Sequence, residues 1–414
     1  MLGFKPPKPN LSVIKVANAI MPLYNRLYLK GLTLEIDAES VARLKSTQDY
    51  STLISPNHAA SADPIVMFLL SKNLSQPFYY MAARETYGKG VFRGFQGFLM
   101  QRLGVYSVVR GTADRNAFRT TRQVLSEGKW PLVIFGEGEI SRQNDTVMRF
   151  ERGPIQLCFW AMDDMKKAEI DKPLYVVPLG IKYRYTKDMW NVIDAALTAL
   201  ERNILPPTAR TPIERYQRLR RIGIAVLKTL ADEYQFKVVP SASLNEQIQG
   251  LKEQILSHAE KIMGIQSDND VLIRVRALKN LVDAEVYRDV EQMTEYERKI
   301  HEEQLQKFQQ FYPDLNRLIN FIAIFDGYVA EEHSPERYLE VIFRLEKEVF
   351  GVAKMRGLRV ASIRTGKPKN LLEHYDTYKS QKKETVEKIT TELETEVQNL
   401  VTELSSEHNL SHKW

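Results

Sequence analysis

A histidine and an aspartate stand five residues apart, directly after a short run of residues that favour strands. The run covers residues 51–55, and Asn57-His58-Ala59-Ala60-Ser61-Ala62-Asp63-Pro64 follows it. An imidazole that a carboxylate orients, and whose charged form that carboxylate stabilises, can remove a proton from a hydroxyl group. His58 and Asp63 are therefore the candidate catalytic residues, with His58 as general base.

The turn that would bring this pair together can be argued from Pro64. On one continuous helix the two side chains would point to different faces, but a residue before proline disfavours helical angles. Pro64 suits the first position of a helix and Asp63 its N-cap, so the loop can fold back. The alternative is that Asp63 only caps the helix and His58 only ends a strand. His58 is, however, the only histidine before His258.

Four segments, taken in order, resemble the motifs of the 1-acylglycerol-3-phosphate acyltransferase family, the glycerolipid acyltransferases with a His-x4-Asp motif. They are His58 to Asp63, Gly104 to Arg110, Phe135-Gly136-Glu137-Gly138, and Val176 to Gly180. The resemblance covers about residues 32 to 185, and four ordered motifs are far more specific than one.

The resemblance implies roles for further residues. Arg110 would hold an acceptor phosphate, which suits the rigid fork of an arginine, and Glu137 with Gly138 would help to position the acceptor. Without the motif, a surface salt bridge is the favoured interpretation of Arg110, and Glu137 between two glycines would be a turn residue.

The third motif departs from the family pattern Phe-Pro-Glu-Gly-Thr-Arg-Ser. Gly136 replaces its proline, Glu139 its threonine and Ile140 its arginine, while Ser141 is retained. A lost arginine and an added carboxylate weaken a phosphate site unless Arg142 or a neighbouring arginine reaches in. Arg142 therefore joins Arg110, Glu137 and Gly138 as a candidate substrate-binding residue.

Alternating short and long apolar segments must position these residues. Strands are predicted at 33–36, 51–55, 78–82, 105–109, 132–135 and 175–181, with helices at 64–70, 87–103, 115–126 and 154–167 between them. This is the pattern of an α/β domain with a mostly parallel sheet flanked by helices, like that of glycerolphosphate acyltransferases. Ligands bind beyond the carboxyl ends of strands in such sheets, where His58, Arg110 and Glu137 fall.

The sequence divides into three segments. Residues 1–31 are an N-terminal amphipathic segment, 32–210 the acyltransferase α/β domain, and 211–414 an all-helical C-terminal region of unknown role. A proline-rich stretch near residue 206 marks the second boundary, and the apolar seam Val386, Ile389, Leu393, Val397, Leu400 and Leu404 predicts a packed C-terminal helix.

The N-terminal segment has five basic residues before position 31 and no acidic one: Lys5, Lys8, Lys15, Arg26 and Lys30. Such a helix suits an anionic membrane surface, although it could also be docked on the domain core. The net charge of +6 and pI of about 9.0 agree with an anionic partner. A single cysteine fits a reducing compartment, and no apolar run is long enough to span a bilayer.

The sequence thus predicts an O-acyltransferase, peripheral on the cytosolic face of a membrane, that moves a fatty acyl group to the hydroxyl of lysophosphatidate. The co-substrate would be an acyl carrier protein or coenzyme A thioester. Because a thiol leaves readily, no metal and no cofactor is expected. Other acceptors, such as glycerol 3-phosphate or another lysophospholipid, stay open, as does a non-catalytic lipid-binding scaffold. No zinc spacing, basic zipper or RNA-binding signature points to nucleic acid.

Overall fold

The computed structural model describes residues 4–87, 91–110, 113–210, 213–265, 271–286, 288, 290, 293–321 and 325–411, without the side chains of 91–93 and 408–411. The chain divides into two compact units. Met1–Arg184 and Leu358–Trp414 make up the α/β unit, and Tyr185–Gly357 make up the helical unit.

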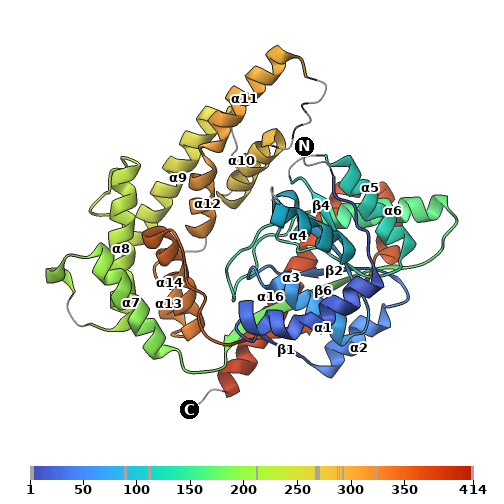
Figure 1. Cartoon of the computed structure of the whole chain (residues 1–414), viewed down its shortest axis with the longest axis horizontal. Coiled ribbons are helices and arrows are strands. Elements are labelled where there is room, and N and C mark those ends of the chain that lie inside the picture. Colours follow the sequence, from blue (N-terminus) through green and yellow to red (C-terminus); the bar gives the residue numbers. More distant parts are fainter. Residues whose placement is uncertain are drawn as a thin grey trace. The chain divides into compact units, whose positions relative to one another are not determined.

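The α/β unit alternates strands and helices along most of its length (Figure 1). Its first stretch contains α1 (Leu11–Tyr28), β1 (Thr33–Ile36), α2 (Ala38–Ser46), β2 (Ser51–Pro56), α3 (Asp63–Asn73), β3 (Tyr79–Ala83), η1 (Arg84–Tyr87), α4 (Val91–Arg102), β4 (Val105–Val108), α5 (Arg115–Glu127), β5 (Leu132–Val133), α6 (Gly153–Lys167) and β6 (Leu174–Tyr185). Its second stretch contains β7 (Arg359–Thr365), β8 (Lys369–Asn370), η3 (Leu371–His374), α15 (Tyr375–Ser380) and α16 (Lys382–Ser411).

The strands among the described residues form one eight-stranded sheet in the order β1-β7-β6-β2-β5-β3-β4, with β8 paired to β6. The pairs β1–β7, β2–β6, β2–β5, β3–β5 and β3–β4 are parallel, and β8 runs antiparallel to β6. This confirms the predicted mostly parallel sheet flanked by helices. The loops that follow β2 and β5 meet because these strands are parallel neighbours.

Both faces of this sheet are buried, which explains its apolar strands. Successive residues alternate between two clusters: Leu53 and Leu132 pack with helices α5, α6 and α16, whereas Ile54 and Val133 pack with α2 and α3. Cys158 of α6 lies in the first cluster, where burial raises the pKa of its thiol. That cysteine is a packing residue.

The last helix, α16, buries all six residues of its predicted apolar seam. Four of them (Val386, Ile389, Leu393 and Val397) join the cluster that covers one face of the sheet. The helix passes close to Gly180 of β6, where a Cβ atom would stand 2.9 Å from Leu400 Cβ. Glycine at this place therefore permits close approach of the helix.

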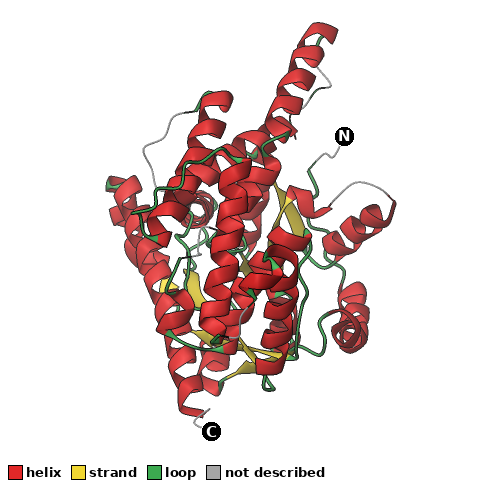
Figure 2. Ribbon diagram, turned by 90° about the vertical axis from the view of Figure 1, so that its left-hand side faces the viewer, coloured by secondary structure: helices red, strands yellow, loops and turns green. Residues whose placement is uncertain are grey.

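The helical unit consists of α7 (Trp190–Ile204), η2 (Pro207–Ala209), α8 (Arg215–Glu233), α9 (Leu244–Met263), α10 (Val271–Val286), α11 (Glu295–Gln309), α12 (Tyr312–Phe321), α13 (Tyr328–Glu331) and α14 (Pro335–Phe350). One apolar cluster, drawn from most of these helices, forms its core. Helices, drawn in red, dominate the chain in Figure 2.

The helical unit is an insertion between β6 and β7 of the sheet. Residues 211–414, expected to be all-helical, are mainly helical but also contain β7 and β8. The boundaries between the two units in the chain therefore fall at 184/185 and 357/358 rather than at the predicted 210/211. Strand β7 was missed because its partner β1 lies more than 320 residues earlier in the chain.

Helix α1 turns its apolar side outward. Leu23 and Leu27 are 60% and 63% exposed, with Val16 and Ile20 also exposed on the same side, and Ile14 is its only fully buried residue. Asn25 points inward instead, and its Nδ2 donates to the carbonyl of Leu32 at 2.6 Å. No helix within the described ranges has the length and apolarity needed to cross a bilayer.

Candidate active site

The predicted catalytic pair is in contact. His58 lies in the loop between β2 and α3, and its Nδ1 is 2.8 Å from Oδ2 of Asp63, the first residue of α3. Asp63 is completely buried, while the His58 side chain is 14% exposed. Residue 62, rather than Asp63, occupies the N-cap, because the Asp63 carboxylate turns back and accepts the backbone N–H of Ala60 at 2.8 Å.

A tyrosine that sequence reasoning missed completes the surroundings of Asp63. The hydroxyl of Tyr183, on β6, donates to Asp63 Oδ1 at 2.5 Å. Burial first, and then the adjacent carboxylate, raise the pKa of the Tyr183 phenol well above its ordinary value. The phenol therefore stays protonated and remains a donor, so that both carboxylate oxygens are held in place.

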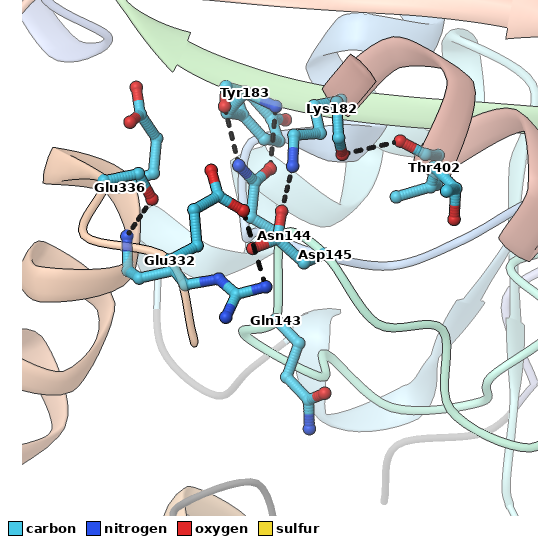
Figure 3. A network of polar contacts seen from close by, with 12 residues as sticks. Gln143, Asn144, Asp145, Lys182, Tyr183, Glu332, Glu336 and Thr402 are labelled. Carbon is cyan, nitrogen blue, oxygen red and sulfur yellow. Dashed lines mark hydrogen bonds and ion pairs between the residues drawn. The ribbon is translucent and has the colours of Figure 1, made fainter. Parts of the chain in front are cut away.

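Two asparagine side chains position the end of β6 that carries Tyr183. Asn57 exchanges two hydrogen bonds with the backbone of Ile181, at 3.0 and 2.7 Å. Asn144 does the same with the backbone of Tyr183, at 2.6 and 2.7 Å, and Figure 3 shows its side chain pointing toward that residue. These amides continue the hydrogen-bond ladder of β6 past the point where β2 ends.

The backbone of His58 is fastened from the loop after β5. Its N–H donates to Oε1 of Glu137 at 2.5 Å, and its carbonyl accepts the N–H of Ser141 at 2.8 Å. The imidazole ring stacks on Phe135, with 4.1 Å between ring centroids. The imidazole is thus held by Phe135 at its face and by Asp63 at Nδ1, and the backbone of His58 is held by two hydrogen bonds.

This arrangement defines what His58 can do. Asp63 occupies Nδ1, so Nε2 is the nitrogen that can receive a proton from an incoming hydroxyl. A buried carboxylate at Nδ1 fixes the tautomer of the imidazole and stabilises the imidazolium that forms. A histidine needs both effects to act as a general base.

Arg110 lies beside the third motif and contacts acidic side chains. Its guanidinium forms ion pairs with Glu85 and with Glu139, the latter at 2.5 Å, and donates to the carbonyl of Gly138 at 3.0 Å. The structure therefore brings together Arg110 and Gly138, two of the candidate substrate-binding residues. It also gives Arg110 two carboxylate partners that an acceptor phosphate would have to displace.

Glu137 and Arg142 have structural features that the sequence did not reveal. The Glu137 carboxylate is fully buried and accepts the N–H of His58 and, at 3.1 Å, that of Met148. Arg142 has a left-handed backbone, with φ of 56°, and is partly buried. Their roles in acceptor binding remain predictions; the observed contacts of Glu137 organise the loop around His58.

The glycine that replaces the motif's proline has a physical reason. A Cβ atom at Gly136 would overlap the ring of Phe150. Phe150 is in turn held by α16, because its N–H donates to Oε2 of Glu394 at 2.8 Å. Gln398 of the same helix accepts the N–H of Val147 at 2.8 Å. The C-terminal helix thus supports the loop that supports His58.

The missed residues differ in how far the sequence could have revealed them. Tyr183 follows Val177, Leu179 and Ile181 at the period of two that places strand residues on one face. Extending the predicted strand 175–181 by two residues would have directed Tyr183 toward the His58 side of the sheet. Glu394 and Gln398 gave no comparable signal.

Comparison with known proteins gave one positive result. Residues 40–182 match the family model described as Acyltransferase, a range close to the 32–185 covered by the four motifs. No curated protein and no solved structure matched the chain. The matched range includes His58, Asp63, Arg110 and Glu137 and lies within the α/β unit, so the similarity to acyltransferases covers the candidate site.

Proposed function

We propose that this protein is a 1-acylglycerol-3-phosphate O-acyltransferase of phospholipid synthesis. It moves a fatty acyl group from an acyl carrier protein or coenzyme A thioester to the hydroxyl of lysophosphatidate. The observation that carries the proposal is the His58–Asp63 contact within the range similar to acyltransferases, with Nε2 of His58 left for the acceptor.

Transfer is direct. His58 Nε2 takes the proton as the acceptor oxygen attacks the thioester carbonyl, and the tetrahedral intermediate then expels the thiolate. The imidazolium returns its proton to that thiolate, so the ester, the free thiol and neutral His58 are restored. Asp63 keeps the Nδ1–H oriented throughout, and Tyr183 keeps Asp63 in place. No covalent acyl-enzyme is needed because a thiolate is a good leaving group.

The acceptor is the part of the proposal that Arg110 bears on. Arg110 suits a phosphate because a guanidinium can bind two oxygens at once, but its ion pairs with Glu139 and Glu85 would have to be displaced by that phosphate. These ion pairs favour a second candidate, an acceptor such as another lysophospholipid whose headgroup need not displace Glu139 and Glu85 from Arg110. Glycerol 3-phosphate would meet the same competition from Glu139 as lysophosphatidate.

The substrates reach the site from a membrane surface in this proposal. The outward apolar side of α1, with Val16, Ile20, Leu23 and Leu27, would enter the lipid, and basic residues of the same segment would contact anionic headgroups. Its inward asparagine and outward leucines argue against the alternative of a helix docked by its apolar face. The protein would thus be peripheral, on the cytosolic face.

Mass spectrometry of reaction products tests the proposal. Purified full-length protein is given mixed lysophospholipids and glycerol 3-phosphate, with acyl carrier protein and coenzyme A thioesters in separate reactions. Phosphatidate should form from lysophosphatidate and be absent with His58→Ala, which should retain the wild-type circular dichroism spectrum. Acylation of another acceptor would favour the second candidate. Binding of lysolipid without any transfer would refute the enzyme and leave a scaffold.

A further inference from the structure

Helix α4 presents two phenylalanine side chains to solvent. Phe95 is 68% exposed and Phe98 is 52% exposed. Among the phenylalanines whose side chains the structure describes, these are the two most exposed. They are three positions apart, so they lie on the same side of the helix. An exposed apolar surface, once it is larger than a single side chain, marks a place where a protein binds a partner or a lipid.

The apolar sides of α4 and α1 adjoin. The chain just before α1 is fastened to the end of α4, because the N–H of Asn10 donates to the carbonyl of Arg102 at 2.9 Å. The Arg102 guanidinium lies over the ring of Phe98, 5.1 Å from its centroid. Leu11, the first residue of α1, follows Asn10 directly and is 54% exposed. The exposed apolar residues therefore continue from one helix to the other.

Both helices lie on one side of the sheet. The connections β2–α3–β3 and β3–α4–β4 step in the same direction through the strand order, so right-handed crossovers place α3 and α4 in one layer. Helix α1 packs on that layer, where Nζ of Lys72, in the last turn of α3, donates to the carbonyl of Asn18 at 3.2 Å. The apolar sides of α1 and α4 therefore belong to one surface of the α/β unit.

Of these two helices, α4 is the one whose apolar side lies toward the active site. Helix α4 follows the carboxyl end of β3, and His58 follows the carboxyl end of β2, which runs in the same direction in the sheet. Phe95 and Phe98 are among the first eight residues of α4, so they lie on the part of the helix nearer that edge. Helix α1 instead contacts the last turn of α3, at the opposite edge.

The charges of the same segments fit an anionic surface. Residues 1–34 and 86–113 contain nine basic residues and no acidic one. The whole chain has 52 acidic residues among 414, so these 62 residues would hold about eight at the average of the chain. Two copies of such a surface would repel each other, whereas anionic headgroups attract it. A bilayer with anionic lipids is therefore favoured over a second copy of the chain.

We propose that α4 is a second membrane-inserting element, whose Phe95 and Phe98 enter an anionic bilayer beside the active site. With α1 it forms one lipid-binding surface, and through α4 the acceptor lipid is delivered to His58 from the bilayer. This delivery rests on the proposed function, whereas the insertion of α4 does not.

A fluorescent label at position 95 tests the insertion in the full-length protein. Cys158 is buried, so Phe95→Cys supplies the thiol that reacts with an environment-sensitive nitrobenzoxadiazole dye. When vesicles of phosphatidylcholine and phosphatidylglycerol are added, the emission of the dye should shift to the blue. Lipids that carry a nitroxide on their acyl chains should quench it. Ile170→Cys, labelled in the same way at an exposed position just after α6, is the matched control and should show neither change.

Three results of the labelling would overturn the proposal. The first is a dye at position 95 that stays in water while the protein sediments with the vesicles, which would leave α1 as the membrane contact. The second is an equal response to vesicles of phosphatidylcholine alone, which would remove the attraction by the basic residues. The third is a blue shift that grows with protein concentration without vesicles, which would indicate a second copy of the chain.

Removing both rings measures their contribution to the affinity for the membrane. Phe95→Ser combined with Phe98→Ser should weaken binding to the anionic vesicles about tenfold or more, because two apolar rings no longer enter the lipid. Both side chains are exposed, so the circular dichroism spectrum should not change. Phe350→Ser, at an exposed phenylalanine of the helical unit, is the matched control and should leave the affinity unchanged. Unchanged affinity of the double variant would contradict the insertion.

Delivery of the acceptor is measured separately with the same double variant. Its kcat/KM should fall about tenfold for long-chain lysophosphatidate held in vesicles, in parallel with its affinity for them. For a short-chain, water-soluble lysophosphatidate kcat/KM should be unchanged. Equal losses with the two acceptors would refute delivery through α4. Absence of turnover in the wild-type protein would count against the proposed function, and the dye at position 95 would still decide the insertion.

Discussion

Replacing Tyr183 by phenylalanine tests the geometry of the active site most directly. The substitution removes one oxygen and leaves the ring, so β6 and the backbone contacts with Asn144 should persist. Asp63 would keep His58 and the Ala60 N–H but lose the donor on Oδ1. What changes is the precision with which the carboxylate faces the imidazole.

The size of the effect follows from the bond that is lost. A hydrogen bond to a charged group contributes roughly 1.5 to 3 kcal/mol, and each 1.4 kcal/mol is about tenfold in rate. We therefore expect kcat to fall about 10-fold to 100-fold. The KM for both substrates should stay within about threefold, because Tyr183 is buried and its hydroxyl donates to Asp63.

The assay is release of free thiol from an acyl-coenzyme A donor, followed with a thiol reagent at varied lysophosphatidate. Tyr106→Phe is the matched control: it removes the hydroxyl of another buried tyrosine, which contacts Thr121 away from the dyad, and should cost stability but not kcat. If Tyr183→Phe retained kcat within twofold of wild type, Asp63 would need no third partner, and the reasoning from this geometry would be wrong.

Four more outcomes can be checked. Glu139→Thr should lower the KM for lysophosphatidate about fivefold, because a partly exposed ion pair with Arg110 is worth roughly 1 kcal/mol; a raised KM would count against Arg110 as the phosphate ligand. Leu23→Glu combined with Leu27→Glu should reduce the affinity for anionic vesicles, measured by cosedimentation, about 100-fold or more, because each leucine buried in the membrane contributes roughly 1.5 to 3 kcal/mol. Val352→Glu, the control at another exposed apolar position, should leave that affinity unchanged. Glu394→Ala should lower kcat severalfold by releasing the Phe150 N–H, whereas Glu403→Ala on the exposed side of α16 should leave kcat unchanged. Burial raises the pKa of Tyr80, Tyr106 and Tyr183, so the unfolded chain loses its phenolic protons first above about pH 10. Urea midpoints should therefore fall between about pH 10.5 and 12, and midpoints that rise over that range would contradict the burial of these phenols.

Local patterns in the sequence were sufficient for the first half of the α/β unit. Strand β1 was predicted with its observed bounds, and the β2–α3 loop was predicted from Pro64 to return Asp63 to His58. Both depend on interactions between residues that are close in the chain. Turn chemistry and alternation of apolar residues are informative at that range.

Contacts between distant segments were beyond such reasoning. Tyr183 meets Asp63 across 120 residues, and Glu394 meets Phe150 across 244. The apolar seam of α16 predicted a buried helix, but the same spacing suits packing on a bundle or on a sheet. Only the fold shows that it covers the sheet and supports the active-site loop.

The place of the helical unit in the chain has a consequence for synthesis on the ribosome. Strand β1 lies at one end of the sheet with β7 as its neighbour, and β7 begins at Arg359, after the whole insertion. At roughly 5 to 20 residues per second, the ribosome needs about 10 to 35 seconds to pass from β6 to β7. During that interval β1 has no β7 to pair with, while the helices of the insertion are synthesised in order and can pack on one another. A released chain that ends before Arg359 should therefore contain a folded helical unit and an unfinished sheet.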